Sequence, residues 1–498
     1  MVMSLVYAFV LLFLLSPDSY IRDLWCRTDS AAFFMCGKAW MNGMIPYVDF
    51  VDSKGPLLWL IYGVGYLLSH HSYVGVFWIS IVFYAVTLFM AYKFCRLYAD
   101  RSVSMVATAL LPAFLFFWKF HYEVRSEDFC YPLIMISLYC TCRILKYRDS
   151  SEKVYLWLSA VVGACVMGAI LIKYSVGAAM MSLMAVVLYM SIRHRRFKKC
   201  FVGMAAGFII PALPFIICFL IYGNLGAFIN EYFLHTAQTI ENIAGDTGSI
   251  FPFRLHPFPV LRKTIVMIFV CTALFGYRYK TGYWLTLCCA FFMFIVAIGT
   301  EAKYYATIIM PFALLLILFF ADIIMGKAKV LRRYAVVISI VFAVVVTLYS
   351  KHYVDDRYVR AIEMRDDLYK VEYIMSQIEN PKVLVHWLDN GSGITVNSLP
   401  ACRHWTHQPG ATDEMIASRI DAVRRQVPDF IIIEENRDKT LTDEDLRHYG
   451  YVFYCHMQSG DRYDCVHSLY GRPGLRLPPA DFHVSQWDVW LKRNIFGI

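Results

Sequence analysis

Acidic and basic side chains gather directly after the first apolar run of this 498-residue chain. Asp29 is followed by a turn-rich stretch that contains Asp49, Asp52 and Lys54 and closes at Pro56. Carboxylates can deprotonate a nucleophile or hold a divalent metal, and an isolated cation can bind a phosphate leaving group. The stretch is therefore the first candidate for chemistry, and its simpler interpretation is a solvated loop.

A second charged cluster stands at the head of a later apolar run. Arg125, Glu127 and Asp128 occupy neighbouring positions there, and such residues are expensive near lipid unless they face a polar cavity. Lys173 lies between two apolar runs, and Lys303 begins another. Each lysine could simply extend to the lipid headgroups, but together with the acids they predict a polar site at one membrane face.

The composition indicates a protein with many membrane spans. Hydrophobic residues make up 59% of the chain, whereas soluble domains contain about 45–50%. Eleven apolar runs are predicted to span the membrane as helices, at 2–15, 73–92, 102–118, 129–145, 154–172, 175–192, 201–222, 260–276, 283–299, 303–325 and 334–349. A further run, 57–68, is too short to cross and is expected to lie at the interface as a helix.

The positions of the basic residues predict how the chain is oriented in the membrane. They fall in alternate connections between the runs: Lys93, Arg96, Arg101; Arg143, Lys146, Arg148, Lys153; Arg193, Arg195, Arg196, Lys198, Lys199; Arg278, Lys280; Lys327, Lys329, Arg332 and Arg333. The positive-inside rule puts these connections in the cytoplasm and puts 16–72, 223–259 and the C-terminal tail outside. The net charge of +9 is then mostly cytoplasmic anchoring, which excludes nucleic acid as a partner.

Hydropathy falls from about residue 351, which predicts two domains, a membrane domain at 1–350 and a small α/β domain at 351–498. The expected elements of the second domain are helices at 358–379 and 413–426 and strands at 382–387, 430–434, 451–456 and 463–467. Cys455 and Cys465 flank a turn between the last two strands, where a disulfide would suit an oxidising compartment; the pairing stays open.

Three parts of the chain resemble the GT-C glycosyltransferases, in particular the protein O-mannosyltransferase and lipid A aminoarabinose transferase branch, which is similar to bacterial glycosyltransferase family 39. They are Asp29, the run Gly43-x-x-Pro46-Tyr47-x-Asp49-Phe50-x-Asp52-x-Lys54-x-Pro56, and the cluster Arg125–Asp128. A weaker likeness is the run of Lys303, Tyr304 and Tyr305 ahead of Met310-Pro311. The resemblance covers about residues 1–350, and many bacterial members of the branch carry a small extracytoplasmic C-terminal domain.

The resemblance implies a polyprenyl-phosphate-sugar donor and a lipid, glycan or protein acceptor that attacks the anomeric carbon with inversion. Asp29 matches the general base or acceptor-orienting carboxylate, and either Glu127 or Asp128 matches a second acid. Phosphate-binding candidates are Lys54, Arg125, Lys173, Lys303 and Tyr304. Candidates for the acceptor side or for a mobile loop over the donor are Asp49, Asp52, Arg254 and His256, and the aromatic residues of 223–259 are equally explained as an interfacial belt.

Two positions depart from the family pattern. Asp29 is followed by Ser30 where an acidic pair is frequent, so a divalent metal stays unassigned, and Gly55 replaces the first proline of a Lys-Pro-Pro motif. The main alternative is a transporter or lipid-glycan flippase, which would place its charges near the bilayer midplane and often show internal repeats. A glycan polymerase or ligase, or an assembly protein, are further alternatives. We therefore expect a multi-pass enzyme of the bacterial inner membrane whose C-terminal domain lies in the periplasm.

Overall fold

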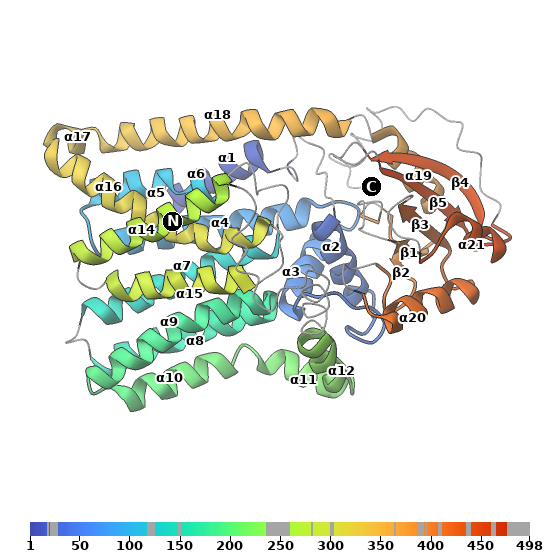
Figure 1. Cartoon of the computed structure of the whole chain (residues 1–498), viewed down its shortest axis with the longest axis horizontal. Helices are drawn as coiled ribbons and strands as arrows, with labels where there is room; N and C mark the ends of the chain where they lie inside the picture. The colour runs from blue at the N-terminus through green and yellow to red at the C-terminus, as the bar shows by residue number, and fades with distance from the viewer. Residues whose placement is uncertain are drawn as a thin grey trace. The chain divides into compact units, whose positions relative to one another are not determined.

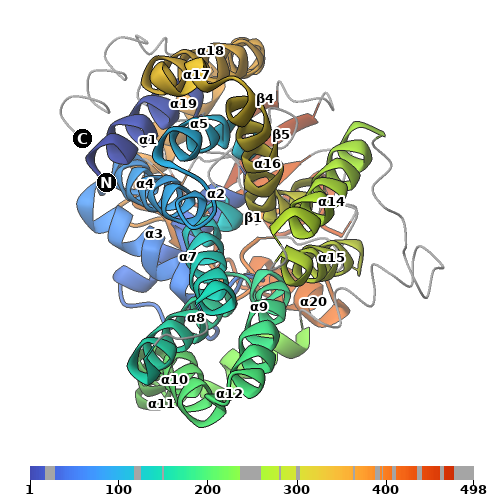
Figure 2. The same ribbon diagram turned by 90° about the vertical axis from the view of Figure 1, so that its left-hand side faces the viewer.

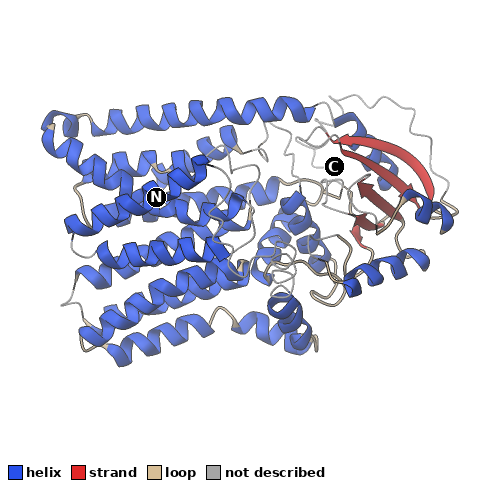
Figure 3. Ribbon diagram, viewed as in Figure 1, coloured by secondary structure: helices blue, strands red, loops and turns tan. Residues whose placement is uncertain are grey.

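A computed structural model describes residues 1–16, 19, 28–116, 125–147, 151–235, 259–279, 282–298, 303–362, 365–386, 393–394, 396–406, 411–434, 440–459 and 465–475. The protein is mostly helical with one small sheet (Figures 1 and 3). It divides into two compact units. Unit 1 comprises 1–15, 80–218 and 244–352, and unit 2 comprises 16–79, 219–243 and 353–498.

Unit 1 is a helical bundle, which Figure 2 shows with many helices close to end-on. Its elements, some of which run on into unit 2, are α1 (Val2–Leu15), α4 (Val74–Cys95), α5 (Arg101–Leu110), α6 (Pro112–Leu115), α7 (Ser126–Lys146), α8 (Glu152–Ile172), α9 (Tyr174–Arg193), α10 (Phe197–Ile209), α11 (Leu213–Ile221), α14 (Pro259–Tyr279), α15 (Gly282–Ile298), the 3₁₀ helix η3 (Lys303–Phe312), α16 (Ala313–Lys327), α17 (Lys329–Arg333) and α18 (Ala335–Ile362).

Each of the eleven apolar runs contains helix, and six helices among the described residues are long and apolar enough to cross a membrane. Two of the runs are interrupted at prolines. One is divided into α5 and α6 just before Pro112, and the other into α10 and α11 at a turn that contains Pro211. Proline lacks the amide hydrogen that an unbroken helix needs, so these interruptions follow from the sequence. Eleven crossings and an extracytoplasmic C-terminal domain remain predictions.

Two glycines let α10 approach α8 closely. A Cβ atom added at Gly207 would lie 1.9 Å from the carbonyl oxygen of Ala160, and one at Gly203 would lie 2.3 Å from that of Leu156. These glycines are four positions apart, the spacing that brings two small residues onto one helix face. The sequence therefore packs this helix pair backbone against backbone.

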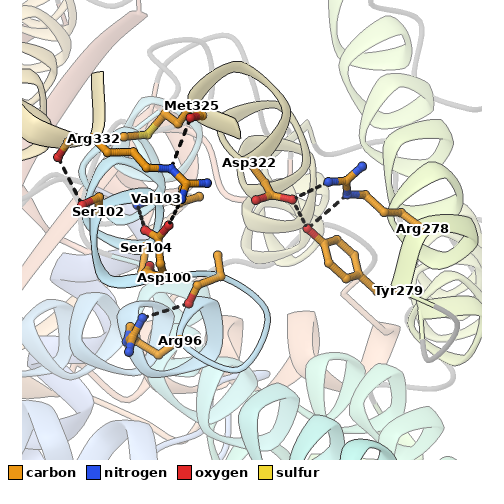
Figure 4. Close-up of polar contacts among 11 residues, drawn as sticks. Arg96, Asp100, Ser102, Val103, Ser104, Arg278, Tyr279, Asp322, Met325 and Arg332 are labelled. Atoms are coloured by element: carbon orange, nitrogen blue, oxygen red, sulfur yellow. Dashed lines mark hydrogen bonds and ion pairs between the residues drawn. The ribbon is translucent and has the colours of Figure 1, made fainter. Parts of the chain in front are cut away.

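Charged side chains join several helices at one end of unit 1 (Figure 4). Arg332 pairs with Asp100 at 3.1 Å, which links α17 to the start of α5. Arg278 pairs with Asp322 of α16 at 2.8 Å, and the Tyr279 hydroxyl donates to the same carboxylate at 2.6 Å. Basic residues that the sequence assigns to the cytoplasmic side thus also connect helices of the bundle; the side of the membrane they face remains a prediction.

Unit 2 combines the segment 16–79, which contains the predicted first outer loop, with the segment 219–243 and the C-terminal region. Its further elements are α2 (Thr28–Met41), α3 (Pro56–Leu68), α12 (Leu225–Ile229), the π-helical turn η2 (Asn230–His235), α19 (Arg365–Ser376), α20 (Asp413–Arg424) and α21 (Asp443–His448). The expected short helix over 57–68 is present as α3. It crosses α2 at glycines, since a Cβ at Gly37 would lie 2.5 Å from the Gly63 nitrogen.

The sheet of unit 2 has the order β2-β1-β3-β5-β4. Its strands are β1 (Lys382–His386), β2 (Leu399–Pro400), β3 (Phe430–Glu434), β4 (Val452–Ser459) and β5 (Cys465–Gly471). β1 is parallel to β2 and β3, whereas β5 is antiparallel to β3 and β4. Leu384, Ile431, Val423 and Leu446 belong to the apolar core that α20 and α21 form with the sheet.

The C-terminal region differs from the expected elements, and its strand register answers the open question of the disulfide. The helix expected over 358–379 is divided between the end of α18 and α19, and β2 and α21 were not anticipated. In the β4–β5 hairpin Cys455 faces Leu469 and Cys465 faces Ser459. This register separates the two cysteines by about 13 Å at a strand rise of about 3.3 Å, too far for a disulfide. The division of the chain at residue 350 remains a prediction.

Candidate functional site

The residues selected from the sequence fall into two groups, each within one unit. In unit 1 are Arg125, Glu127, Asp128, Lys173, Lys303 and Tyr304. In unit 2 are Asp29, Asp49, Asp52 and Lys54. Lys303 and Tyr304 occupy the first two positions of η3, where only the backbone is described, and Arg254 and His256 lie outside the described residues.

Lys54 is held at the end of the first-loop motif by its neighbours. Its backbone amide donates to Asp52 Oδ1 at 3.0 Å, and its ammonium donates to Ser53 Oγ at 2.9 Å. The ammonium lies 4.0 Å from the Asp52 carboxylate and 5.2 Å from the centre of the Phe33 ring. The aromatic face and the hydroxyl stabilise the ammonium, and the Asp52 carboxylate lies at the edge of ion-pair distance.

The turn before Lys54 is fixed by side-chain contacts to the backbone. Asp49 Oδ2 accepts a hydrogen bond from the Ile45 amide at 2.7 Å, so this acid supports the turn. Tyr47 has a φ of 62°, which is unusual for a residue with a side chain. Its hydroxyl donates to the Lys54 carbonyl at 3.2 Å, and Asn224 Nδ2 donates to the Pro46 carbonyl at 2.7 Å.

Aromatic side chains enclose Tyr47 and account for its strained backbone. Its ring lies 4.6 Å from Trp59, 5.2 Å from Phe228 and 5.7 Å from Phe219 between ring centres. Burial raises the pKa of Tyr47, so the hydroxyl stays protonated and remains a donor. A conformation that costs about 1–3 kcal/mol persists only where the surroundings determine it, which points to a preorganised turn.

Asp29 lies in the first turn of α2, where its side chain is half-buried. Among the described residues its carboxylate has neither a hydrogen-bond nor an ion-pair partner. The positive end of the helix dipole favours a negative charge at this position. A carboxylate at this position can accept a hydrogen bond from a hydroxyl group and orient it.

In unit 1 the adjacent acids Glu127 and Asp128 have different partners. Glu127 forms a buried ion pair with Lys173 and accepts a hydrogen bond from Ser126 Oγ at 3.0 Å. Asp128 accepts the Arg125 backbone amide at 2.8 Å and the Tyr84 hydroxyl at 2.7 Å. In a capping box, an acid at the third helical position accepts a hydrogen bond from the amide of the N-cap residue, as Asp128 does here from Arg125. Asp128 therefore has a structural task at the start of α7.

Several polar residues of these clusters were missed by the sequence reasoning. Tyr84 lies within an apolar run and gives no signal of its own. Lys38 and Glu231 did give a signal in the sequence, because each is a charged residue among apolar or aromatic neighbours. Both are buried. Arg403 forms an ion pair with Glu231 from a distant part of unit 2. Within the described ranges, no three His, Cys, Asp or Glu side chains are placed to hold a metal ion.

Comparison with known proteins extends this picture. Residues 53–222 match the family model for dolichyl-phosphate-mannose-protein mannosyltransferase. The structure resembles ArnT from Cupriavidus metallidurans bound to undecaprenyl phosphate, with a TM-score of 0.56 and 12% identity over 94% of this chain and 96% of that chain. For apo ArnT the TM-score is 0.53 with 13% identity and the same coverage.

A third similar structure is the oligosaccharyltransferase AglB from Archaeoglobus fulgidus with an inhibitory peptide and a dolichol-phosphate. Its TM-score is 0.47 with 12% identity, over 98% of this chain and 74% of that chain. No curated protein is significantly similar in sequence.

The likeness to ArnT concerns the fold, which extends over nearly the whole of both chains. The family match is independent of it and begins at Ser53, beside Lys54. The family match thus covers residues 53–222, and the shared fold covers nearly the whole chain.

Proposed function

We propose that the protein transfers a sugar from a polyprenyl-phosphate donor to a hydroxyl or amine acceptor at the outer face of a bacterial inner membrane. The observation that carries the proposal is the family match that begins at the Ser53–Lys54 motif, where Lys54 is held by Ser53, Asp52 and the Phe33 ring. The undecaprenyl phosphate in the ArnT structure supports this lipid class for the donor.

In the proposed reaction an acceptor oxygen or nitrogen attacks the anomeric carbon while the bond from that carbon to the phosphate oxygen breaks. The phosphate leaves with the bonding electron pair, and the acceptor proton passes to the Asp29 carboxylate and then to solvent. A positioned base contributes about 10²–10⁴-fold to such a step. Lys54 stabilises the charge that develops on the phosphate, and preorganised electrostatics of this kind are usually the larger effect.

Of the two adjacent acids, we assign the functional role to Glu127. Asp128 already serves the start of α7 and Tyr84, whereas Glu127 points its carboxylate at Lys173. In this proposal the pair orients the acceptor or the sugar, and Arg125 contributes a further positive charge. Lys303 and Tyr304 remain candidates for the donor phosphate, and Arg254 and His256 for a loop over the donor.

The test is transfer by the purified full-length protein from a panel of radiolabelled undecaprenyl-phosphate sugars. Wild type is compared with Asp29→Asn, Lys54→Met and the surface control Asp421→Asn. We expect wild type and control to release undecaprenyl phosphate, Asp29→Asn to lose at least 100-fold in kcat, and Lys54→Met to weaken donor binding. Full activity of Asp29→Asn would remove its assigned role. Failure of wild type to bind any donor would favour the transporter alternative.

A further inference from the structure

A C-terminal segment contacts the first outer loop within unit 2. We call the described residues 393–394 and 396–406 the clamp segment. The first contact is made by Lys38, which lies on α2 and is fully buried. Its ammonium donates to the carbonyls of Gly393 and, at 2.9 Å, Val396, and it lies 3.5 Å from Ser398 Oγ.

A buried ammonium is expensive unless its hydrogen atoms have acceptors. Here two of the acceptors are backbone carbonyls from a region more than 350 positions away along the chain. The position of these carbonyls relative to α2 therefore matters for the energy of the buried lysine. Lys38 therefore ties the helix that carries Asp29 to the clamp segment.

A second contact lies beside the motif that carries Lys54. The amide of Val51, which directly precedes Asp52, donates to the carbonyl of Arg403 at 2.9 Å. The guanidinium of Arg403 pairs with Glu231, a buried residue of η2. One residue of the clamp segment thus holds the first-loop motif through its backbone and η2 through its side chain.

A third contact is made by Asn397 of the clamp segment. Tyr66 of α3 donates from its hydroxyl to Asn397 Oδ1 at 3.1 Å, and Asn42 Nδ2 donates to the same hydroxyl at 3.2 Å. The end of α2, α3 and the clamp segment are joined in this way by one short chain of hydrogen bonds. The three contacts together restrain α2, α3 and the first-loop motif against one segment.

We propose that the clamp segment holds the first outer loop in its working geometry, with Lys38 and Arg403 as positioning residues for Asp29 and Lys54. This inference rests on the proposed function, because it takes Asp29 and Lys54 as the residues that touch acceptor and donor. It gives the C-terminal region a part in catalysis that does not require it to bind an acceptor. A misplacement of about 1 Å at a reacting group can reduce the rate about 10²-fold, so loss of the clamp should act mainly on kcat.

The test combines kinetics with hydrogen–deuterium exchange on the full-length protein. The variants are Lys38→Met and Arg403→Met, with Lys198→Met and Arg425→Met as exposed controls and Arg403→Lys as the conservative variant. For both clamp variants we expect kcat to fall at least 10-fold with KM for the donor changed less than 3-fold. We also expect faster amide exchange in residues 46–55, unchanged exchange in α8, and recovery of most activity in Arg403→Lys.

The possible outcomes distinguish the proposed function from the positioning role of the clamp segment. Absence of transfer by wild type refutes the proposed function, and with it the catalytic role of the clamp, whatever the exchange shows. Transfer by wild type with unchanged exchange at 46–55 in both variants refutes the clamp alone. Faster exchange without a change in kcat refutes the positioning role. If Lys38→Met fails to fold, the positioning role is tested with Arg403→Met, Glu231→Gln and the double variant. Because Arg403 and Glu231 form one ion pair, the two substitutions should have a non-additive effect on kcat.

Discussion

Glu127 and Lys173 form a buried ion pair between the first turn of α7 and the junction of α8 with α9. Both side chains are at least 96% buried, so each charge depends on the other in the absence of water. From the sequence, extension of Lys173 to the lipid headgroups was one alternative, and the structure instead directs it to an acid of the second cluster. Because the two charges depend on each other, single substitutions should affect stability differently from the double substitution.

We predict that Glu127→Gln and Lys173→Met each destabilise the protein by about 3–5 kcal/mol, because each leaves one charge buried alone. The double variant should recover most of the stability, since neither charge remains, but should stay inactive if the pair is functional. Thermal unfolding in detergent and sugar transfer measure the two effects. The matched control is the exposed pair Arg196–Glu152, whose loss should cost about 0–1 kcal/mol.

We expect Tyr47→Phe to lower donor affinity about 5-fold with a loss of stability of about 1 kcal/mol. It removes the hydroxyl that donates to the Lys54 carbonyl but keeps the aromatic packing, and one hydrogen bond contributes about 0.5–1.5 kcal/mol. Binding of an undecaprenyl-phosphate sugar checks the prediction, with the exposed Tyr277→Phe as control. An unchanged affinity would separate Tyr47 from the position of Lys54.

Substitution of Gly207 by alanine should destabilise the α8–α10 pair by about 1–3 kcal/mol through overpacking. The added Cβ would overlap the Ala160 carbonyl, which is backbone and cannot turn away. At Gly326 of α16 no atom lies within 4 Å of an added Cβ, so Gly326→Ala is the control and should be neutral or slightly stabilising. Equal unfolding temperatures for the two variants would contradict the packing.

Acid should weaken the start of α21. Hydrogen bonds from the Thr442 side chain and amide hold the pKa of Asp445 below its ordinary value. A carboxyl group whose pKa is lowered by folding contributes stability above its unfolded pKa of about 3.9, and this contribution is lost as the pH falls through the folded pKa. The protection factors of the amides in residues 443–448, which are corrected for the slower intrinsic exchange in acid, should therefore fall below about pH 4. Thr442→Ala should destabilise the start of α21 by about 1 kcal/mol, and so lower the protection of these amides at neutral pH as well.

The hairpin register also makes a chemical prediction. After oxidation, peptide mapping without reduction should find no crosslink between Cys455 and Cys465, because Cys455 lies opposite Leu469. Many hydrogen bonds between the strands hold this register. A slip of several residues would break them and would also change the packing of the side chains that face the core. A Cys455–Cys465 peptide in good yield would show that the register is wrong.

Elements with a strong local signal could be read from the sequence. The apolar runs predicted helices such as α8 and α9, the run Phe430–Glu434 predicted β3, and Asn380-Pro381 marked the end of α19 to within a few residues. The strand β2 and helix α21 were missed because each is short. Periodicity needs several turns or alternations before it is distinguishable from chance.

For the candidate site, the sequence alone determined the residue types: an acid at Asp29, a cation at Lys54, and two acids beside Arg125. It also determined the glycines that let helices approach and the prolines that interrupt them, since these properties belong to single residues. Only the tertiary structure decided that Asp128 serves its helix while Glu127 pairs with Lys173, and that Lys38 and Arg403 join the C-terminal segment to the first loop. The physical reason is that a hydrogen bond or ion pair depends on distance in space, and Lys173 and the carbonyls that Lys38 contacts lie far from their partners along the chain.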